Sequence, residues 1–420
     1  MPLSSYLDYA VLHAQLTALS VIGTQPTVPG RTRLALSDAD RLARDQLVAW
    51  LRAMDLTVHI DAVGNIYGIL EPEPAYAHVP VLLIGSHIDT VIEAGAYDGC
   101  YGVLAGLAVL RALRAAGVTP PRPVGIVAFS NEEGVRFQPD MLGSLTVAGG
   151  MPVAAVLDLV STDGACYGDE LVRIGYAGPM VPGSLPIHAY LELHIEQGPI
   201  LAASGVSLGA VHTLQGISWQ RITLSGVANH AGTTPLHLRH DPLVVAAQVI
   251  AALRSYALQS TATVATVGTL ELAPSAINVI PHTVTFTLDL RDPDDAALNR
   301  AEAHLEQLLA THASAEGVTA HCTPLARFAP VVFDAGLVDS ISAVARSHGI
   351  SCMPIVSGAG HDAQMIARIA PSAMIFVPSR DGISHNPAEY TAPTDLEAGL
   401  RVLCDVVARQ LGITLTERSN

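Results

Sequence analysis

Five side chains of the kinds that bind metal ions are spread along this chain of 420 residues. Three imidazoles and two carboxylates are enough to hold two neighbouring divalent ions, with one carboxylate bridging them. The pattern therefore predicts a hydrolytic site with two metals. Each side chain lies in a short motif at or just after a segment that reads as a strand: His87 in GSHIDT, Asp98 in YDG, Glu133 in NEEG, His194 in ELHIEQG and His385 in ISHNP.

Each of these residues, taken alone, has a simpler explanation. A histidine at a strand end is more often structural than a ligand, and Asp98 could merely cap the helix that follows it. Glu132 and Glu133 could be solvated acids that open a helix, or one could bind metal while the other faces water. His87 and Asp89 form an HxD pair, in which Asp89 can orient the imidazole ring of His87. The set as a whole favours a metal site.

Short apolar segments predict the strands that would position these residues. They cover residues 81–85, 124–129, 191–195 and 373–377. Between the first two, residues 102–116 are apolar on nearly every face and end at Gly117, which is typical of a buried helix. Strand, helix and strand at this spacing predict a parallel sheet, whose carboxyl ends are where ligands bind. Residues 36–54 predict a further helix, with Ser37 as its N-cap.

The region after residue 213 changes character. Strands are expected at 217–224, 264–272, 283–290 and 318–323, and helices from Asp241-Pro242 to about 258 and over 296–313. That order, βαββαβ, is ferredoxin-like. The fold class predicted is α/β: a mainly parallel-sheet dimetal hydrolase domain with an inserted α+β ferredoxin-like domain. The catalytic domain would be residues 1–212 and 330–420, and residues 213–329 would form a lid that dimerises through its open sheet.

Composition narrows the possible functions. The net charge of −16 argues against a nucleic-acid partner. All 22 basic residues are arginine, which excludes a Schiff-base lysine and the lysine of a phosphate-binding loop. The N-terminus does not read as a signal peptide, and no apolar run has the length of a membrane span. A cytoplasmic protein without membrane contact is expected, since the cysteines are scattered and form no CxxC pair: Cys100, Cys166, Cys322, Cys352 and Cys404.

The motifs resemble those of the N-carbamoyl-L-amino-acid hydrolase, allantoate amidohydrolase and β-ureidopropionase family, within the wider aminoacylase and carboxypeptidase-like metallopeptidase group. The resemblance runs from RLALSDADRLARD to SHNPAEYT, nearly the whole chain. ELHIEQGP and NHAGTTP are specific to the carbamoylase-like branch, whereas HxD and EE occur across the group. One departure is VIEAGAYDG, where relatives often carry a Pro-Asn-Gly stretch; it spares the ligands.

The resemblance implies roles for individual residues. His87 and His194 would bind one ion, Glu133 and His385 the other, and Asp98 would bridge them. Glu132 would be the general base, with Asp89 supporting it. The remaining implied residues are substrate or catalytic contacts: His230, which would reach into a partner subunit's site and polarise the scissile carbonyl, Asn278 and Arg291, which would hold the substrate carboxylate, and Gln197, Gln215 and Gly360.

The residues themselves leave some of these roles open. Arg291 closes an alternating strand and its guanidinium suits a carboxylate, but a surface salt bridge with Asp289, Asp292 or Asp294 is the alternative. His237 and His240 look like additional ligands but are expected to be structural or on the surface. His361 and Asp362, in SGAGHDA, are expected to line or support the site.

The predicted function is metal-dependent hydrolysis of a linear ureido bond in a small carboxylate-bearing substrate. N-carbamoyl-L-amino acids and allantoate are examples, and ammonia and carbon dioxide would be released. The two divalent ions could be Zn²⁺ or Mn²⁺, and Co²⁺ or Ni²⁺ would also serve. The alternatives are a dipeptidase or aminoacylase of the same group, and a catalytically dead metal-binding dimer scaffold.

Overall fold

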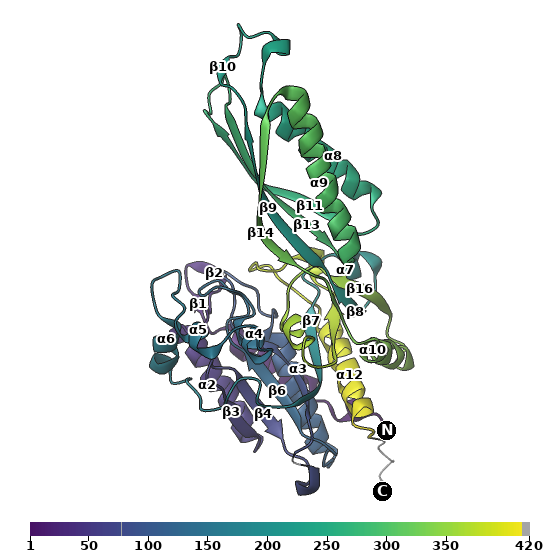
Figure 1. Cartoon of the computed structure of the whole chain (residues 1–420). Coiled ribbons are helices and arrows are strands. Elements are labelled where there is room, and N and C mark those ends of the chain that lie inside the picture. Colours follow the sequence, from purple (N-terminus) through teal and green to yellow (C-terminus); the bar gives the residue numbers. More distant parts are fainter. Residues whose placement is uncertain (77, 414–420) are drawn as a thin grey trace. The chain divides into compact units, whose positions relative to one another are not determined.

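The computed structural model describes residues 1–76 and 78–413 (Figure 1). The chain divides into two compact units, Met1–His212 with Phe333–Asn420, and Thr213–Val332. Residues 414–420 of the predicted catalytic domain lie outside the described residues.

The larger unit is built on a mixed sheet with the strand order β8-β17-β7-β5-β6-β4-β3, and β16 pairs with β8. Four central strands, β17, β7, β5 and β6, run parallel. The strands are β3 (Thr57–Ile60), β4 (Ile66–Leu70), β5 (Val81–His87), β6 (Val124–Phe129), β7 (Ile187–Ile195), β8 (Leu208–Leu214), β16 (Cys352–Ser357) and β17 (Ser372–Val377); a short pair, β1 (Thr24–Gln25) and β2 (Val28–Arg31), stands apart from the sheet.

The prediction of a mainly parallel sheet is wrong outside this centre. Strands β3 and β4 are antiparallel to each other, β4 is antiparallel to β6, and β8 is antiparallel to β17. The reason lies in the connections. Parallel neighbours need a long crossover such as the helix α3 (Cys100–Ala115) between β5 and β6, whereas β3 and β4 are joined by a short turn at Gly64, whose φ is +87°.

The carboxyl ends of the four parallel strands meet at one edge of the sheet. His87, the last residue of β5, lies opposite Phe129, the last residue of β6. His194 of β7 lies opposite Phe376 of β17. The loops that leave this edge therefore start side by side, as the strand-end argument requires.

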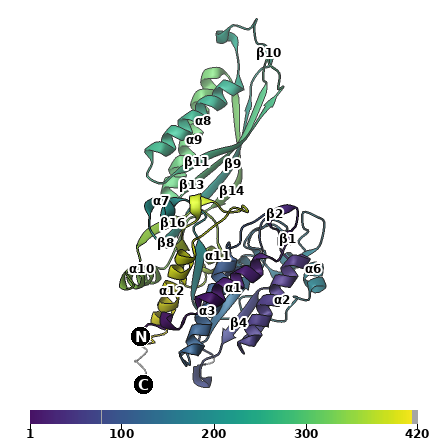
Figure 2. The same ribbon diagram turned by 180° about the vertical axis from the view of Figure 1, so that it is seen from behind.

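Helices cover the faces of this sheet (Figure 2). Helix α3 packs on β5 and β7, and helix α12 packs on β7, β17 and α3; α1 packs against α3, and α10 against α12. The alternate face of β7 meets the short helix α11, and the short helix α4 packs against α11 and β6. The helices are α1 (Tyr9–Ser20), α2 (Asp38–Ala53), α3 (Cys100–Ala115), α4 (Leu142–Val147), α5 (Val153–Leu157), α6 (Tyr167–Ile174), α7 (Ile200–Ser204), α10 (Ala335–Ser347), α11 (Asp362–Ile366) and α12 (Pro393–Gln410), with 3₁₀ turns η1 (Leu3–Tyr6), η2 (Pro74–Tyr76) and η4 (Arg380–Gly382).

Local sequence signals explain two of these helices. Ser37 caps α2, because its hydroxyl accepts a hydrogen bond from the backbone N–H of Asp40, as predicted. Helix α3 is buried on nearly all sides, as its apolar sequence indicated. It begins at Cys100 after the N-cap Gly99, so the carboxylate of Asp98 does not cap it.

The smaller unit is a four-stranded antiparallel sheet in the order β11-β13-β9-β14, with α8 and α9 on one face (Figure 1). Asp241 caps α8 through the N–H of Leu243, with Pro242 in the first turn. Helix α8 is long and apolar enough to cross a membrane by length and composition alone. Its residues Val245, Val249 and Leu253 are nevertheless buried in the hydrophobic core of this unit. The elements are β9 (Gly216–Ser225), β10 (Asn229–His230), η3 (Leu236–Leu238), α8 (Pro242–Gln259), β11 (Val264–Ala273), β12 (Val279–Ile280), β13 (Thr283–Asp292), α9 (Asp295–Glu316), β14 (Thr319–Phe328) and β15 (Val331–Val332).

Candidate metal centre

The carboxylate of Asp98 lies at the centre of a cluster in the larger unit. Its Oδ1 is 3.1 Å from Nε2 of His194 and 3.6 Å from Nε2 of His87. Its Oδ2 is 3.2 Å from Nε2 of His385, which is itself 3.4 Å from Oε2 of Glu133. Two groups with the spacing of metal ligands contain Asp98: His87, Asp98 and His194 in one and Asp98, Glu133 and His385 in the other; a third, Glu192, His194 and His361, does not. Asp98 is the member that the first two groups share.

Backbone carbonyls fix how two of the imidazoles face this carboxylate. Nδ1 of His87 lies 3.0 Å from the carbonyl oxygen of Asp89, and Nδ1 of His194 lies 2.8 Å from that of Ile195. A ring that donates from Nδ1 presents the lone pair of Nε2 to the cluster, which is the form a metal ligand needs. The backbone N–H of Gly99 points at Nε2 of His194 from 3.2 Å, which fits this assignment.

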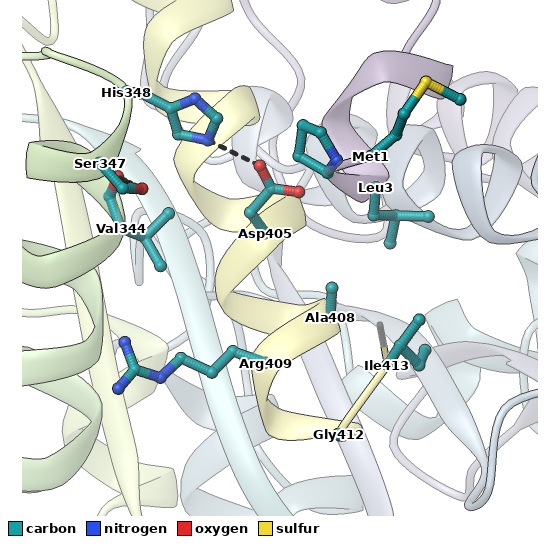
Figure 3. A pocket seen from close by; sticks show the side chains of 11 residues that line it. Met1, Leu3, Val344, Ser347, His348, Asp405, Ala408, Arg409, Gly412 and Ile413 are labelled. Atoms are coloured by element: carbon teal, nitrogen blue, oxygen red, sulfur yellow. Dashed lines mark hydrogen bonds and ion pairs between the residues drawn. The ribbon is translucent and has the colours of Figure 1, made fainter. Parts of the chain in front are cut away.

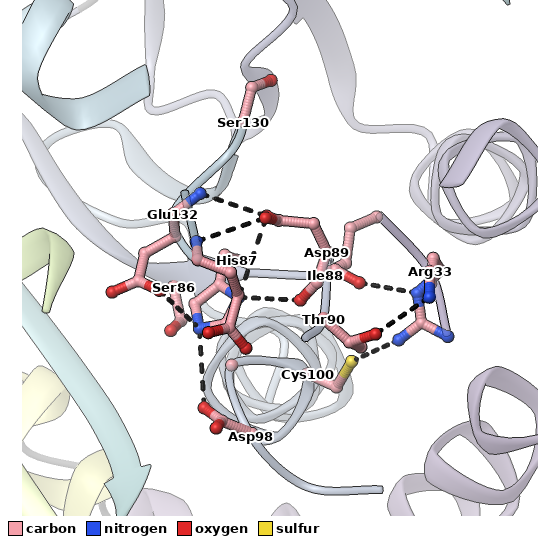
Figure 4. A network of polar contacts seen from close by, with 12 residues as sticks. Arg33, Ser86, His87, Ile88, Asp89, Thr90, Asp98, Cys100, Ser130 and Glu132 are labelled. Carbon is pink, nitrogen blue, oxygen red and sulfur yellow. Dashed lines mark hydrogen bonds and ion pairs between the residues drawn. The ribbon is translucent and has the colours of Figure 1, made fainter. Parts of the chain in front are cut away.

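The carboxylate of Asp89 does something different from what the HxD pair suggested. It lies 3.8 Å from Nδ1 of His87, too far to orient the ring. It accepts instead from the backbone N–H groups of Glu132 and Glu133, each at 3.3 Å. The side chain of Asp89 therefore holds the segment with the two glutamates, and its carbonyl holds His87 (Figure 4).

Glycine is needed where the chain passes His87. At Gly99 a Cβ atom would lie 2.4 Å from the imidazole of His87, and the backbone there has a φ of +61°. Any side chain would displace the ring or the segment that carries Asp98.

Two residues that the sequence reasoning missed hold the loops of Asp98 and His385 together. The buried carboxylate of Glu389 accepts from the N–H groups of Tyr97, at 2.9 Å, and Asp98, at 3.3 Å. The hydroxyl of Ser384 lies 3.0 Å from Glu389 and 3.3 Å from Oδ2 of Asp98. Both lie in or beside the SHNPAEYT motif, which was the available signal. Nothing in the sequence alone names their partners.

The histidines and Asp98 adjust one another's ionisation. Burial acts to raise the pKa of Asp98, but contacts with the imidazoles of His194, His385 and His87, when these rings are protonated, outweigh it and hold the pKa well below its usual value. The hydrogen bond to Asp98 raises the pKa of His385 to about 9. Burial acts to lower the pKa of His87, yet the negative charge of Glu132 and its other acidic neighbours raises it well above the ordinary value.

The two glutamates bind protons more tightly than exposed glutamates do. Burial, together with repulsion from Asp98, raises the pKa of Glu133 to about 8. Burial also raises the pKa of Glu132 well above its ordinary value, although nearby His87 opposes the shift. Divalent cations bound among these buried, crowded carboxylates would compensate their negative charge and favour the ionised form.

A buried carboxylate oxygen of Glu133 also indicates that these side chains suit a metal ion. Oε1 of Glu133 is buried and, among the described residues, has no hydrogen-bond partner. A buried carboxylate oxygen without a donor is costly, and a cation removes that cost. Imidazole and carboxylate together suit Zn²⁺, Mn²⁺ and related ions.

A cavity of about 140 Å³ opens beside the cluster. Gln197, Gly360 and His361 line it along with most of the predicted ligands, and so does Asp140, which sequence reasoning did not select. The amide nitrogen of Gln197 donates to Oδ2 of Asp98 at 2.8 Å. A larger cavity of about 660 Å³ lies elsewhere in the unit, lined by Met1, α10 and the end of α12, and none of the predicted site residues borders it (Figure 3).

His361 and Asp362 lie under the cluster. The ring of His361 packs edge-on against that of His194, with centroids 4.5 Å apart, and burial lowers its pKa well below the usual value. Within the described chain, Nε2 of His361 and Oδ2 of Asp362 have no hydrogen-bond partner. Glu192, which the sequence reasoning passed over, accepts from the N–H of Ala363 at 2.8 Å and so fixes the start of α11. Its place two residues before His194 in a strand was the available signal.

The smaller unit carries the other predicted contacts. Strands β10 and β12 pair so that His230 faces Val279, and the N–H of Ala231 donates to the carbonyl of Asn278. His230 and Asn278 are thus neighbours and both are exposed. Nδ1 of His230 accepts from the N–H groups of Gly232, at 3.0 Å, and Thr233, at 3.2 Å, which leaves Nε2 as an N–H donor.

Arg291 forms the salt bridge that was its alternative explanation. Its guanidinium donates to Asp289, with Nη2 2.8 Å from Oδ2, and the pair is partly exposed. Gln215 lies between β8 and β9. His240 interacts with the carbonyl of Glu316 at 3.0 Å, a structural contact. His237 lies in the turn η3 on the surface.

An α/β unit with a histidine and carboxylate cluster at the carboxyl ends of its parallel strands is typical of metal-dependent hydrolases. Residues 83–409 match the sequence profile described as Peptidase family M20/M25/M40, and the chain belongs to this family.

Individual relatives are similar over nearly the whole chain. An N-carbamoyl-L-amino acid amidohydrolase from Geobacillus stearothermophilus is 36% identical over 94% of this chain and 97% of its own length. An allantoate amidohydrolase from Bacillus subtilis is 35% identical over 90% and 92%. A crystal structure of a hydantoinase/carbamoylase family amidase from Burkholderia multivorans has a TM-score of 0.93 and 39% identity, and covers 97% of this chain and 99% of its own. The resemblance seen in the motifs is confirmed.

Proposed function

We propose that this chain hydrolyses the ureido bond of a small carboxylate-bearing molecule such as an N-carbamoyl-L-amino acid or allantoate. The observation that carries the proposal is the convergence of three imidazoles and two glutamates on Asp98 at the ends of parallel strands. The names of the relatives supply the bond class. One water is consumed, and the amine, ammonia and carbon dioxide are the products.

His87, His194 and Asp98 would hold one divalent ion, and Glu133, His385 and Asp98 a second. Such ions, when bound, supply Lewis acidity that polarises the scissile carbonyl and makes water easier to deprotonate. Glu132 would accept the water's proton; its Oε2 lies 3.4 Å from Nε2 of His87, at the edge of the cluster, which supports this role. It then donates that proton to the leaving nitrogen.

The smaller unit would supply the substrate contacts, as a lid. Nε2–H of His230 is available to donate to the scissile carbonyl oxygen. Asn278 and Arg291 would bind the carboxylate, with Gln197, Gln215 and Gly360 as further contacts. Arg291 must then share its guanidinium between Asp289 and substrate. We propose that two subunits pair through these units and that His230 serves the partner's site, as an isologous dimer permits. A cytoplasmic setting remains our expectation.

Ammonia release tests the proposal. The metal-loaded protein is assayed, with added Mn²⁺ or Zn²⁺, on an N-carbamoyl-L-amino acid, allantoate, β-ureidopropionate and ureidoglycolate. A dipeptide and an N-acyl amino acid serve as the contrast. Turnover of one or more ureido compounds over both contrasts is expected. Preference for the dipeptide or acyl substrate would overturn the proposed bond class, and no turnover of any substrate would overturn the enzyme itself.

A further inference from the structure

Arg33 is a fully buried arginine whose partners are unusual. Its side chain has no measurable exposure to solvent. A buried guanidinium ordinarily has a carboxylate partner, as Arg44 has in Asp40 at 2.7 Å. In the part of the chain that the structure describes, the guanidinium of Arg33 instead donates to backbone carbonyls and to a thiol. Its placement therefore reflects the geometry of those groups rather than a neighbouring negative charge.

The partners of Arg33 lie at both ends of one loop of the candidate metal centre. Nε donates to the carbonyl of Ile88 at 2.6 Å, and Ile88 lies between His87 and Asp89. Nη2 donates to Sγ of Cys100 at 3.0 Å, two residues after Asp98. One planar group thus contacts the residues that follow His87 and Asp98, and so joins the two ends of the loop between them (Figure 4).

The third side of the guanidinium is anchored to a helix. Nη1 donates to the carbonyl of Leu19 at 3.1 Å, in the last turn of α1, and to that of Ile22 at 2.9 Å. The carbonyl of Leu19 also accepts from the backbone N–H of Ile22 at 3.1 Å, and Ile22 lies just beyond the end of α1, so Arg33 is tied to the C-terminal end of this helix. The guanidinium that contacts Ile88 and Cys100 is therefore also fixed to the end of α1.

The backbone around Arg33 strengthens the same arrangement. Its N–H donates to Oγ1 of Thr90 at 2.9 Å, and its carbonyl accepts from the N–H of Thr90 at 2.9 Å. Arg31 exchanges two further backbone hydrogen bonds with Ala94, at 3.2 and 2.7 Å. The segment 31–33 thus lies along the loop that connects His87 to Asp98.

We infer that Arg33 is a positioning residue of the metal centre, whose guanidinium sets the spacing between the imidazole of His87 and the carboxylate of Asp98. That spacing is 3.6 Å between Nε2 and Oδ1, and both residues belong to the ligand group of His87, Asp98 and His194. The inference rests on the proposed metal centre. Arg33 touches no substrate in this scheme and acts only through the ligands it spaces.

Metal affinity in Arg33→Lys tests the inference. Lysine keeps the positive charge, but its single ammonium group cannot donate at the same time to the carbonyl of Ile88 and to Sγ of Cys100, as the separate N–H groups of the guanidinium do. Outer partners of metal ligands typically contribute about 10- to 100-fold in affinity, so a loss of that size is expected. The dissociation constant for Zn²⁺ is measured by competition with a chromophoric chelator, without substrate, and metal content is measured after dialysis.

Two further variants separate positioning from general stability. Ile341→Ala is the matched control: Ile341 is fully buried in α10 and contacts no predicted ligand, so it should lower the melting temperature but leave Zn²⁺ affinity unchanged. Cys100→Ala removes one acceptor only, and should give an intermediate loss of affinity. It also carries the test if Arg33→Lys does not fold.

The outcomes are distinct. Affinity lost in Arg33→Lys and Cys100→Ala, but kept in Ile341→Ala at a similar loss of melting temperature, supports the inference. Affinity within about twofold of the control in both variants overturns it. A wild-type protein that binds Zn²⁺ but releases no ammonia overturns the proposed function and leaves the role of Arg33 standing.

Discussion

Replacing Glu132 by Gln removes one carboxylate from the centre and leaves its backbone contacts in place. The N–H of residue 132 still donates to Asp89, and its carbonyl still accepts from Met141 at 2.7 Å. The contact that changes is the one between Oε2 and Nε2 of His87, 3.4 Å apart. The shape of the site is kept and only the proton acceptor is lost.

The expected loss of turnover follows from that single change. General-base groups contribute about 10²- to 10⁴-fold, which equals about 3 to 5 kcal/mol in the activation barrier. The melting temperature of the metal-free protein should change little, because burial raises the pKa of Glu132 and favours its uncharged form, which Gln resembles. Metal content should stay that of the wild type, since Glu132 belongs to neither ligand group.

The neighbouring residue provides the matched control. Glu133→Gln changes the same chemical group one position along, but its Oε2 lies 3.4 Å from Nε2 of His385, within a ligand group. This variant should lose metal as well as activity. Ammonia release, elemental analysis and melting curves are measured on both proteins. Full activity of Glu132→Gln with normal metal content would refute its role as base, and metal lost equally from both variants would make Glu132 a ligand.

Four further predictions concern other parts of the site. His194→Ala should lower metal content after dialysis, because Asp98 loses its closest imidazole; unchanged stoichiometry would remove it from the ligand set. Arg291→Lys should raise KM for carboxylate-bearing substrates, and equal impairment of a substrate without a carboxylate would make it structural. Mixed subunits of His230→Ala and Glu132→Gln should recover about a quarter of wild-type sites, because random pairing makes half the dimers mixed with one intact site each; no recovery after confirmed exchange would contradict a shared site. Burial raises the pKa of Glu133 to about 8, so the folded metal-free protein keeps a proton that the unfolded chain releases, and its melting temperature should fall as pH rises from about 4.5 through 8, with metal reversing the trend; a flat profile would contradict this.

Local pattern was enough to find the elements at the centre of the fold. The strand expected at residues 124–129 is β6 with the same bounds, and the caps Ser37 and Asp241 were both readable. Each of these signals lies within a few residues, where hydrophobic period and cap chemistry act directly. The short strands β3 and β4 were not among the strands expected from the sequence. Their antiparallel direction could not be read either, because it depends on which strand each one joins.

The residue types of the site were also readable, but the partners of its polar groups were not. A strand-end histidine or carboxylate is visible in the sequence, and the register of parallel strands brings such residues together. That Asp89 holds the two glutamates, that Glu389 holds Asp98 and that Arg33 spans Ile88 and Cys100 could not be read, because a buried donor takes whichever acceptor the fold brings within about 3 Å. The sequence determined which buried polar groups need hydrogen-bond partners, and the packing of distant segments decided which groups became those partners.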